Sequence, residues 1–273
     1  MSSLEPREFD EALTVLPAGV GKDVFYEVLV RGMGRRPAVN QETIVERLFE
    51  RMIAGDRGAV RDIVNETIEE GISAEELSKE VYWEVMEMIS SLYRADQLST
   101  LGHHYATRLL RSLVNQAQGR YTQKPRRTRT ILMFCGSSES DELAGQLVAD
   151  LIEADGYEIW FGGGGVAGDE ILAEVGARNP DILLMFASAP GDAPHIRRLI
   201  DTIRNIDAHP DLQIVVGGGV FNRAEGLAEE IGADLWAKSP AELLDRVAKE
   251  PRRRATADQR TVGRHRRSNK SAA

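Results

Sequence analysis

The chain has 273 residues, of which 42% are hydrophobic and 28% charged, and its formal net charge is −9. This composition is typical of a water-soluble protein with room for two domains, and no apolar run approaches the ~20 residues of a membrane span. A single cysteine, Cys135, excludes an internal disulfide framework and a zinc site built from cysteine pairs. Because the N-terminus also lacks the basic and apolar parts of a signal peptide, we expect a cytoplasmic protein without membrane contact.

The first part of the chain is expected to be helical. Residues 1–40 form an N-terminal extension that is too interrupted by glycine and proline to contain a helix-turn-helix. Residues 41–119 carry the periodicity of four amphipathic helices joined by short turns. Ser73 is placed to cap the third helix, and Glu76 is placed to complete a capping box. Four such helices with short connections predict an antiparallel helical bundle.

The second part alternates strands and helices. Residues 120–129 are polar and basic and predict a linker, and residues 130–249 predict an α/β domain. The expected strands span 130–136, 158–162, 182–188, 213–219 and 235–238, and the expected helices lie near 140–155, 167–178, 194–207, 223–231 and 240–249. Nearly continuous apolar strands separated by helices predict a doubly wound, five-stranded parallel sheet of the Rossmann-like, flavodoxin type. In that fold, ligands bind beyond the carboxyl ends of the strands.

The C-terminal end has a composition of its own. From Pro251 onward, eight basic side chains stand against one acidic residue, Asp258, and bulky apolar residues are almost absent. Such a segment buries too little surface to fold, so residues 250–273 are predicted to form a disordered basic tail. A weak electrostatic contact with nucleic acid is the function that this charge allows, while the acidic remainder of the chain argues against nucleic-acid binding by the folded part.

Small residues end four of the predicted strands. Gly163, Gly165 and Gly168 fit G-x-G-x-x-G, which is typical of dinucleotide-binding turns. The pattern follows the second strand rather than the first, and no acidic residue ends the next strand to hold a ribose, so NAD and FAD are disfavoured. Glycine clears space for a close approach to the backbone, and we therefore expect a large ligand across several strands. The residues expected to line it are Ser137, Ser138, Gly163, Gly164, Ser188, Gly217, Gly218 and Gly219.

The pairing of a four-helix bundle with such a domain resembles the cobalamin (vitamin B12)-binding module of methionine synthases, corrinoid methyl carriers and light-sensing cobalamin regulators. That family's motif has three parts, D-x-H-x-x-G, S-x-L and G-G, at spacings that this chain reproduces. Here 42 residues separate Gly145 from Ser188, and 26 separate Pro190 from Gly217. The resemblance covers roughly residues 40–249 and implies adenosyl- or methylcobalamin bound between bundle and sheet.

The resemblance also implies roles for individual residues of the α/β domain. Ser188, Gly217 and Gly218 would line the slot for the nucleotide tail of cobalamin, and Gly145 would begin the helix beside it. The histidine that ligates cobalt from below in the family is absent: alignment through Gly145 places Glu142 there, and alignment from the strand places Glu139 there. A carboxylate is a poor substitute for imidazole at such a position.

In light-sensing members, the bundle carries a Trp and, nine residues later, Glu-His, whose histidine ligates cobalt from above. That register places Tyr93 at the Trp, His103 at the Glu and His104 at the His. The resemblance therefore implies His104 as the metal ligand, with Tyr93 over the corrin and His103 shielding or orienting the ligand. A helical wheel places both histidines beside an apolar stripe, which is equally typical of a solvated surface pair; the stripe runs through Leu98, Leu101, Tyr105, Leu109 and Leu113. His195 is the alternative ligand.

These observations lead to one functional hypothesis and two alternatives. The sequence shows no catalytic triad, P-loop or metal-ligand spacing, so we expect no turnover. The hypothesis is a cobalamin-binding sensor, switched by light or ligand, that acts through a protein partner such as a transcription regulator or through a homo-oligomer. The first alternative is a corrinoid methyl carrier of a methyltransferase system, which the loss of the tuning histidine disfavours. The second alternative is a sensor that holds haem or a bilin instead.

Overall fold

The computed structural model describes residues 41–256 and Gln259, so the extension predicted for residues 1–40 lies outside it. Four helical segments come first: α3 (Gln41–Ile53), α4 (Arg57–Glu69), a continuous segment of α5 (Ala74–Glu76), η1 (Leu77–Tyr82) and α6 (Trp83–Arg94), and α7 (Thr100–Gln118). They correspond to the four helices that the periodicity predicts. Within the described residues, no helix is both long and apolar enough to cross a membrane.

The third helical segment begins as predicted and then departs from the prediction. Ser73 and Glu76 form the expected capping box, since the Glu76 amide donates to Ser73 Oγ and the Ser73 amide to Glu76 Oε2. The next turn, η1, is a π-helix. Hydrophobic periodicity cannot distinguish one wider turn from a regular one, and for this reason the sequence did not indicate it. The π-helix places Ser78 where its Oγ accepts a 2.6 Å hydrogen bond from Tyr121, at the start of the linker.

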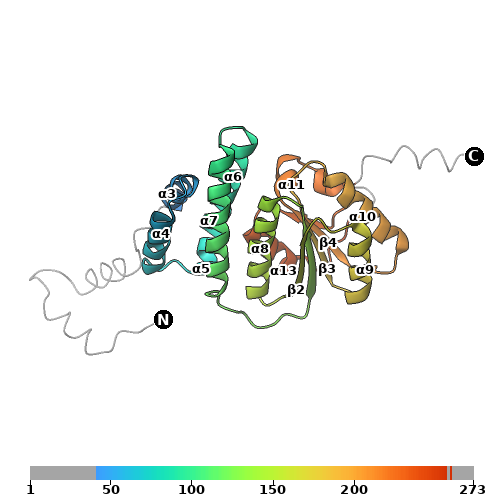
Figure 1. Ribbon diagram of the computed structural model, residues 1–273. Helices are drawn as coiled ribbons and strands as arrows, with labels where there is room; N and C mark the ends of the chain where they lie inside the picture. The colour runs from blue at the N-terminus through green and yellow to red at the C-terminus, as the bar shows by residue number, and fades with distance from the viewer. Residues whose placement is uncertain (1–40, 257–258, 260–273) are drawn as a thin grey trace, which may run out of the picture. The chain divides into compact units, whose positions relative to one another are not determined.

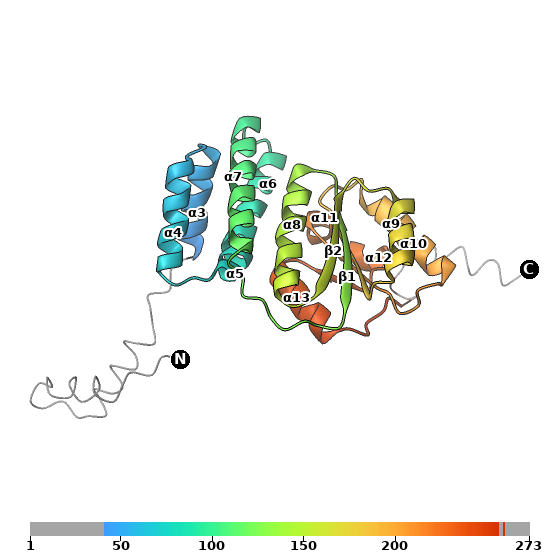
Figure 2. The same cartoon turned by 60° about the horizontal axis from the view of Figure 1, so that its bottom comes forward.

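The sheet has the predicted flavodoxin-type topology. Its strands are β1 (Thr130–Cys135), β2 (Glu158–Gly164), β3 (Ile182–Phe186), β4 (Gln213–Gly217) and β5 (Leu235–Ala237), all parallel, in the order β2-β1-β3-β4-β5. α8 (Glu139–Ala154) and α13 (Pro240–Lys249) cover one face (Figures 1 and 2). α9 (Gly168–Arg178) and α10 (Ala193–Ile206) cover the other. The chain reverses direction across the sheet between β1 and β3, which is where this topology places a ligand.

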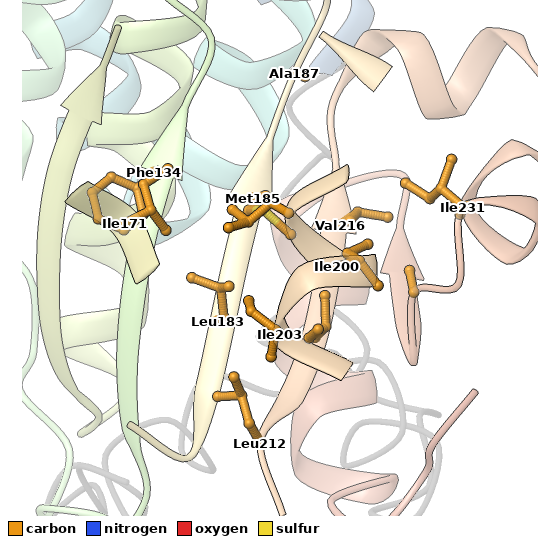
Figure 3. Packing of buried hydrophobic residues seen from close by; sticks show 14 of the residues in the cluster. Phe134, Ile171, Leu183, Met185, Ala187, Ile200, Ile203, Leu212, Val216 and Ile231 are labelled. Atoms are coloured by element: carbon orange, nitrogen blue, oxygen red, sulfur yellow. The ribbon is translucent and has the colours of Figure 1, made fainter. Parts of the chain in front are cut away.

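The core on the α9 and α10 face shows why the strands read as continuous apolar runs. Leu183 and Met185 of β3 point toward Ile200 and Ile203 of α10, and the alternate residue Leu184 faces α13 (Figure 3). The single helix expected near residues 223–231 is instead two short ones, α11 (Gly219–Arg223) and α12 (Leu227–Glu230). Gly226, whose φ is +78°, breaks the helix between them.

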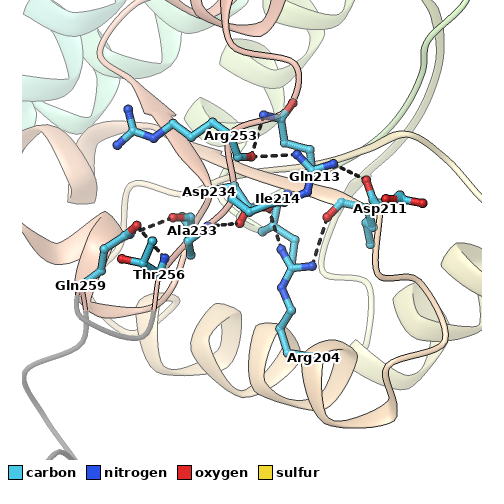
Figure 4. A network of polar contacts seen from close by, with 12 residues as sticks. Arg204, Asp211, Gln213, Ile214, Ala233, Asp234, Arg253, Thr256 and Gln259 are labelled. Atoms are coloured by element: carbon cyan, nitrogen blue, oxygen red, sulfur yellow. Dashed lines mark hydrogen bonds and ion pairs between the residues drawn. The ribbon is translucent and has the colours of Figure 1, made fainter.

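The chain does not leave the fold at residue 250, which corrects the predicted tail boundary. The buried carboxylate of Asp234 accepts hydrogen bonds from the Ile214 amide, Arg204 Nη2 and the Ala255 amide, each at 2.6 Å (Figure 4). Gln213 Nε2 donates to the carbonyls of Glu250 and Arg253 at 2.8 and 3.2 Å. Composition missed this because the segment is held by backbone hydrogen bonds rather than by apolar burial. Residues 257–258 and 260–273 lie outside the described part of the chain.

Candidate functional site

The carboxyl edge of the sheet contains a buried acid that sequence reasoning missed. Ser138 caps α8 by accepting from the Asp141 amide at 3.0 Å, and Ser138 Oγ donates to Asp141 Oδ2 at 2.8 Å. Asp141 Oδ1, buried, has no hydrogen-bond partner in the described part of the chain. Burial raises the pKa of Asp141, the hydroxyls of Ser188 and Ser138 lower it, and Asp192 raises it. The Ser-x-x-Asp spacing of a helix cap, Ser138 to Asp141, is the signal that could have identified this residue.

The glycines of this edge serve two different needs. A Cβ at Gly164 would overlap the Gly136 carbonyl, and one at Gly218, whose φ is +97°, would overlap the Ala187 carbonyl. Both glycines are therefore required by close backbone packing. At Gly145, a Cβ would meet the Phe161 ring at 2.8 Å, so this glycine lets α8 pack on β2. Gly163 differs: a Cβ there would meet no atom within 4 Å, and its φ of +74° is the feature that favours glycine. Whether Gly145, Gly164 and Gly218 also contact a ligand stays a prediction.

A cavity of about 430 Å³ opens at the point where the chain reverses across the sheet. Its floor is apolar and includes Phe134, Met185 and Leu199, and its lining also includes the polar Ser137, Asp192 and His195. His195, the alternative metal ligand, thus lies on the α9 and α10 face. The volume falls in the range of ~300–1,000 Å³ that small-molecule sites occupy.

The slot on the opposite face is nearly closed. It is lined by Gly217 and Gly218, as the sequence predicts, and by Phe186 and Leu243, but its volume is only about 20 Å³. The indole of Trp83, from the first turn of α6, forms one wall. Its ring meets Phe186 edge-on, with centroids 6.1 Å apart and an interplanar angle of 80°. Sequence reasoning missed Trp83, because its position in an apolar helical stripe is typical of core.

Two predicted residues of the bundle lie together at the start of α7 and the end of α6. The imidazole of His103 stacks on Tyr93, with centroids 4.0 Å apart and an interplanar angle of 23°. His103 is only 8% exposed, and its Nδ1 has no hydrogen-bond partner among the described residues. Burial lowers the pKa of His103, the neighbouring His104 lowers it further, and Glu139 of α8 raises it. Glu139 lies at the sheet edge, so the His103 imidazole is near that edge.

The apolar stripe expected on α7 is out of phase by one residue in the first half of the helix. Leu101 and Tyr105 are 58% and 43% exposed, and the buried face of this half runs through His103 and Ala106. In the second half of α7 the predicted Leu109 and Leu113 are buried as expected. Tyr105 lies over Gly55, where a Cβ would be 3.2 Å from its ring. His104 is exposed, so the residue implied as metal ligand lies on the solvent side of the helix and His103 on the buried side.

Two family models match the chain, each described as a B12 binding domain. One covers residues 44–118 and the other residues 129–245, which together make up more than two thirds of the chain. The chain belongs to the B12-binding family. It is a cobalamin-binding protein with a B12-binding cap and a B12-binding α/β domain, which confirms the resemblance. Neither model refers to haem or a bilin, and neither concerns light sensing or transcription.

Several solved structures are similar to this chain, and the first of those named here shares its fold. The monomethylamine corrinoid protein of Methanosarcina barkeri has a TM-score of 0.67 at 16% identity, covering 77% of this chain and 99% of its own. A cobalamin-binding protein of Desulfitobacterium hafniense DCB-2 has a TM-score of 0.40 at 17% identity, covering 74% and 96%. The methanol:cobalamin methyltransferase complex of Methanosarcina barkeri has a TM-score of 0.43 at 13% identity, covering 95% and 97%. No curated protein is similar enough in sequence to match.

The residues of the edge fit part of a B12 molecule and not all of it. The cavity of about 430 Å³ at this edge has room for part of a large ligand. Within the described ranges, no group of three or more His, Cys, Asp or Glu is arranged to hold a metal ion. The slot beside Gly217 has no room for a nucleotide base. Glu142, exposed in the first turn of α8, offers no imidazole.

A cluster of charged side chains also lies between the cap and the carboxyl edge of the sheet. Burial raises the pKa of Glu87 in α6, and the nearby guanidinium groups of Arg94 and Arg223 lower it. Arg223 Nη2 donates to the Ser188 carbonyl at 2.5 Å. These side chains, scattered over the sequence, are near one another only because α6 of the bundle lies near the β3 and β4 ends. Their spacing carried no motif that sequence reasoning could use.

Proposed function

We propose that this protein is a corrinoid carrier, which holds a B12 cofactor at the carboxyl edge of the sheet and presents it to a methyltransferase partner. In this role the chain itself performs no turnover. The observation that carries the proposal is its make-up: residues 42–256 consist of a helical bundle and a B12-binding sheet domain, a pair that aligns with 99% of a corrinoid protein. This favours the alternative of the sequence analysis over its main hypothesis.

In the carrier, the cofactor supplies the chemistry, since cobalt accepts and releases methyl groups. The protein residues bind and orient it. The oxygen of Asp141 that lacks a partner would accept an amide donor of the cofactor, and Tyr93, stacked on the His103 ring, would lie on its cap side. Glu87 of α6 and Arg223 of α11 bring opposite charges together where the cap meets the sheet domain.

The test is binding followed by methyl transfer. The protein is loaded with methylcobalamin that carries an isotopically labelled methyl group, desalted, and mixed with a corrinoid-dependent methyltransferase and its acceptor. A carrier delivers label to the acceptor at a rate that depends on the concentration of the loaded protein. A protein that stays colourless after loading, or one that keeps its label while free methylcobalamin is consumed, contradicts the proposal.

A second function is favoured by one observation, the unpartnered Nδ1 of His103. An imidazole that ligates cobalt from the cap closes the upper face to methyl transfer and suits a sensor. A sensor of this kind is expected to change its oligomeric state between dark and light. Size-exclusion chromatography of the protein loaded with adenosylcobalamin measures this change. An unchanged elution volume together with methyl transfer would contradict the sensor and support the carrier.

A further inference from the structure

The slot beside Gly217 is closed by a side chain of the cap. Trp83 is 4% exposed, and its indole packs on Phe186, the last residue of β3. The remaining volume, about 20 Å³, has room for about one water molecule. A purine or benzimidazole base is many times larger, so it enters only if a wall moves.

The other walls belong to the sheet domain. Val148 of α8, Phe186 of β3 and Leu243 of α13 form part of them, and backbone hydrogen bonds hold the strand ends. Gly217 pairs with Ala237 of β5, and its carbonyl accepts from the Ala187 amide at 3.0 Å. Gly218 is pressed against Ala187 in a conformation with positive φ. Trp83 is therefore the wall that a side-chain change can remove without disturbing the sheet.

The lower side of the site lacks the group that displaces a corrinoid's own base. Neither the turn at residues 136–138 nor α8 contains a histidine, and Glu142 is exposed. A cobalt that receives no protein imidazole from below keeps its own base as ligand, or has water there if the corrinoid has no base. This observation is independent of the closed slot.

We propose that Trp83 is a specificity residue, which excludes the nucleotide tail so that this chain binds a corrinoid without inserting its lower base. The favoured ligand is a corrinoid that keeps its base on its own cobalt or lacks the nucleotide altogether. The proposal rests on the proposed function, namely that the edge binds a corrinoid.

The experiment compares the affinities of the full chain for cobalamin and for cobinamide, which lacks the nucleotide. Equilibrium dialysis with visible absorbance measures both for the wild type and for Trp83→Leu, Trp83→Ala, Ile196→Trp and Trp160→Leu. The wild type is expected to bind cobalamin no more tightly than cobinamide. Trp83→Ala is expected to increase cobalamin affinity at least about tenfold, with cobinamide affinity changed less than about threefold.

The other variants decide between explanations. Trp83→Leu opens the slot less and keeps an apolar wall, so it tests the proposal if Trp83→Ala does not fold; its cobalamin affinity is expected to rise in the same direction. Trp160→Leu, on β2 away from the slot, is the matched control and is expected to change neither affinity. Ile196→Trp narrows the cavity on the opposite face, which is part of the candidate ligand site, so it is expected to change both affinities by the same factor and to leave their ratio unchanged.

Three results would overturn the proposal. The first is a wild type that binds cobalamin more tightly than cobinamide. The second is a Trp83 variant that folds and leaves the ratio of the two affinities unchanged. The third is a loss of cobalamin affinity alone in Ile196→Trp, which would place the nucleotide tail on the opposite face of the sheet. Failure of both ligands to bind the folded wild type contradicts the proposed function instead.

Discussion

At His103, the family's sequence register and the side-chain geometry point to different residues as the candidate ligand. The family register implies His104 as ligand, but the imidazole that is buried, stacked on Tyr93 and unpartnered at Nδ1 belongs to His103. Two neighbouring residues of a helix point about 100° apart, so only one of them faces the sheet edge. A sequence motif alone places a helical residue only to within about one position. For this reason the sequence pointed to His104 rather than to its neighbour His103.

The two histidines are separated by paired substitutions. If the cap supplies a cobalt ligand, as the second function requires, His103→Ala loaded with hydroxocobalamin is expected to shift the visible spectrum toward water-ligated cobalt, because the lowered pKa of His103 keeps its imidazole neutral near pH 7. For the carrier, the spectrum is expected to stay unchanged. His104→Ala, at an exposed position of the same helix turn, is expected to leave the spectrum of the loaded wild type unchanged. The opposite result would restore the register-based choice, and two unchanged spectra would exclude a cap ligand.

Asp150 of α8 is a second buried acid, and its effect is on stability. Its Oδ1 accepts from Gln146 at 2.6 Å, and its Oδ2 has no hydrogen-bond partner in the part of the chain described. Burial raises the pKa of Asp150 to about 6. Because the folded protein holds this proton more tightly than the unfolded chain, the charge destabilises the fold increasingly as pH rises from about 4 to about 6.

Asp150→Asn is therefore expected to be more stable than the wild type at pH 7.5, by about 1–3 kcal/mol, and to differ little at pH 4. Urea unfolding at several pH values measures this difference. Glu153→Gln removes a nearby exposed carboxylate from the same helix and serves as the control for net charge. Equal pH dependence of Asp150→Asn and the wild type would show that Asp150 is charged in the fold at no cost.

At the scale of elements, periodicity predicted nearly everything that hydrophobic burial decides. The helix expected at 140–155 is α8 (Glu139–Ala154), and all five strands are present. The differences lie where backbone contacts decide. β2 continues through Gly164 because this glycine lies against the Gly136 carbonyl, and a glycine run looks like a loop when its partner strand is unknown.

The C-terminal segment gives an element-scale prediction. Truncation after Glu250 removes the Ala255 amide from Asp234 and the Arg253 carbonyl from Gln213, which are both buried. Leaving these groups without partners is expected to destabilise the fold by about 2–4 kcal/mol. Thermal unfolding measures the loss. Truncation after Gln259 keeps the segment and is expected to melt with the full chain; equal melting of both truncations would mean that the segment adds nothing.

At the scale of the whole molecule, α8 explains why bundle and sheet domain occur together. Eleven of its residues are buried, on every side of the helix. A helix that is buried all round needs cover on both sides. The sheet provides one side, and α6 and α7 of the bundle provide the other. The apolar run of this helix was visible in the sequence, but it does not say which element supplies the second cover, because only the fold brings α7 next to α8.

Removal of the bundle is therefore expected to damage the sheet domain itself. A fragment of residues 120–259 should expose the bundle-facing side of α8, bind a hydrophobic dye such as ANS, and melt at least about 10 °C below a fragment of residues 42–259. Both fragments keep the C-terminal segment, so the difference reports the bundle alone. A fragment 120–259 that melts with the longer one and binds no dye would mean that α8 needs no cover from the cap. In that case the cap would serve the ligand only, and changes at Trp83 would leave the stability of the sheet domain untouched.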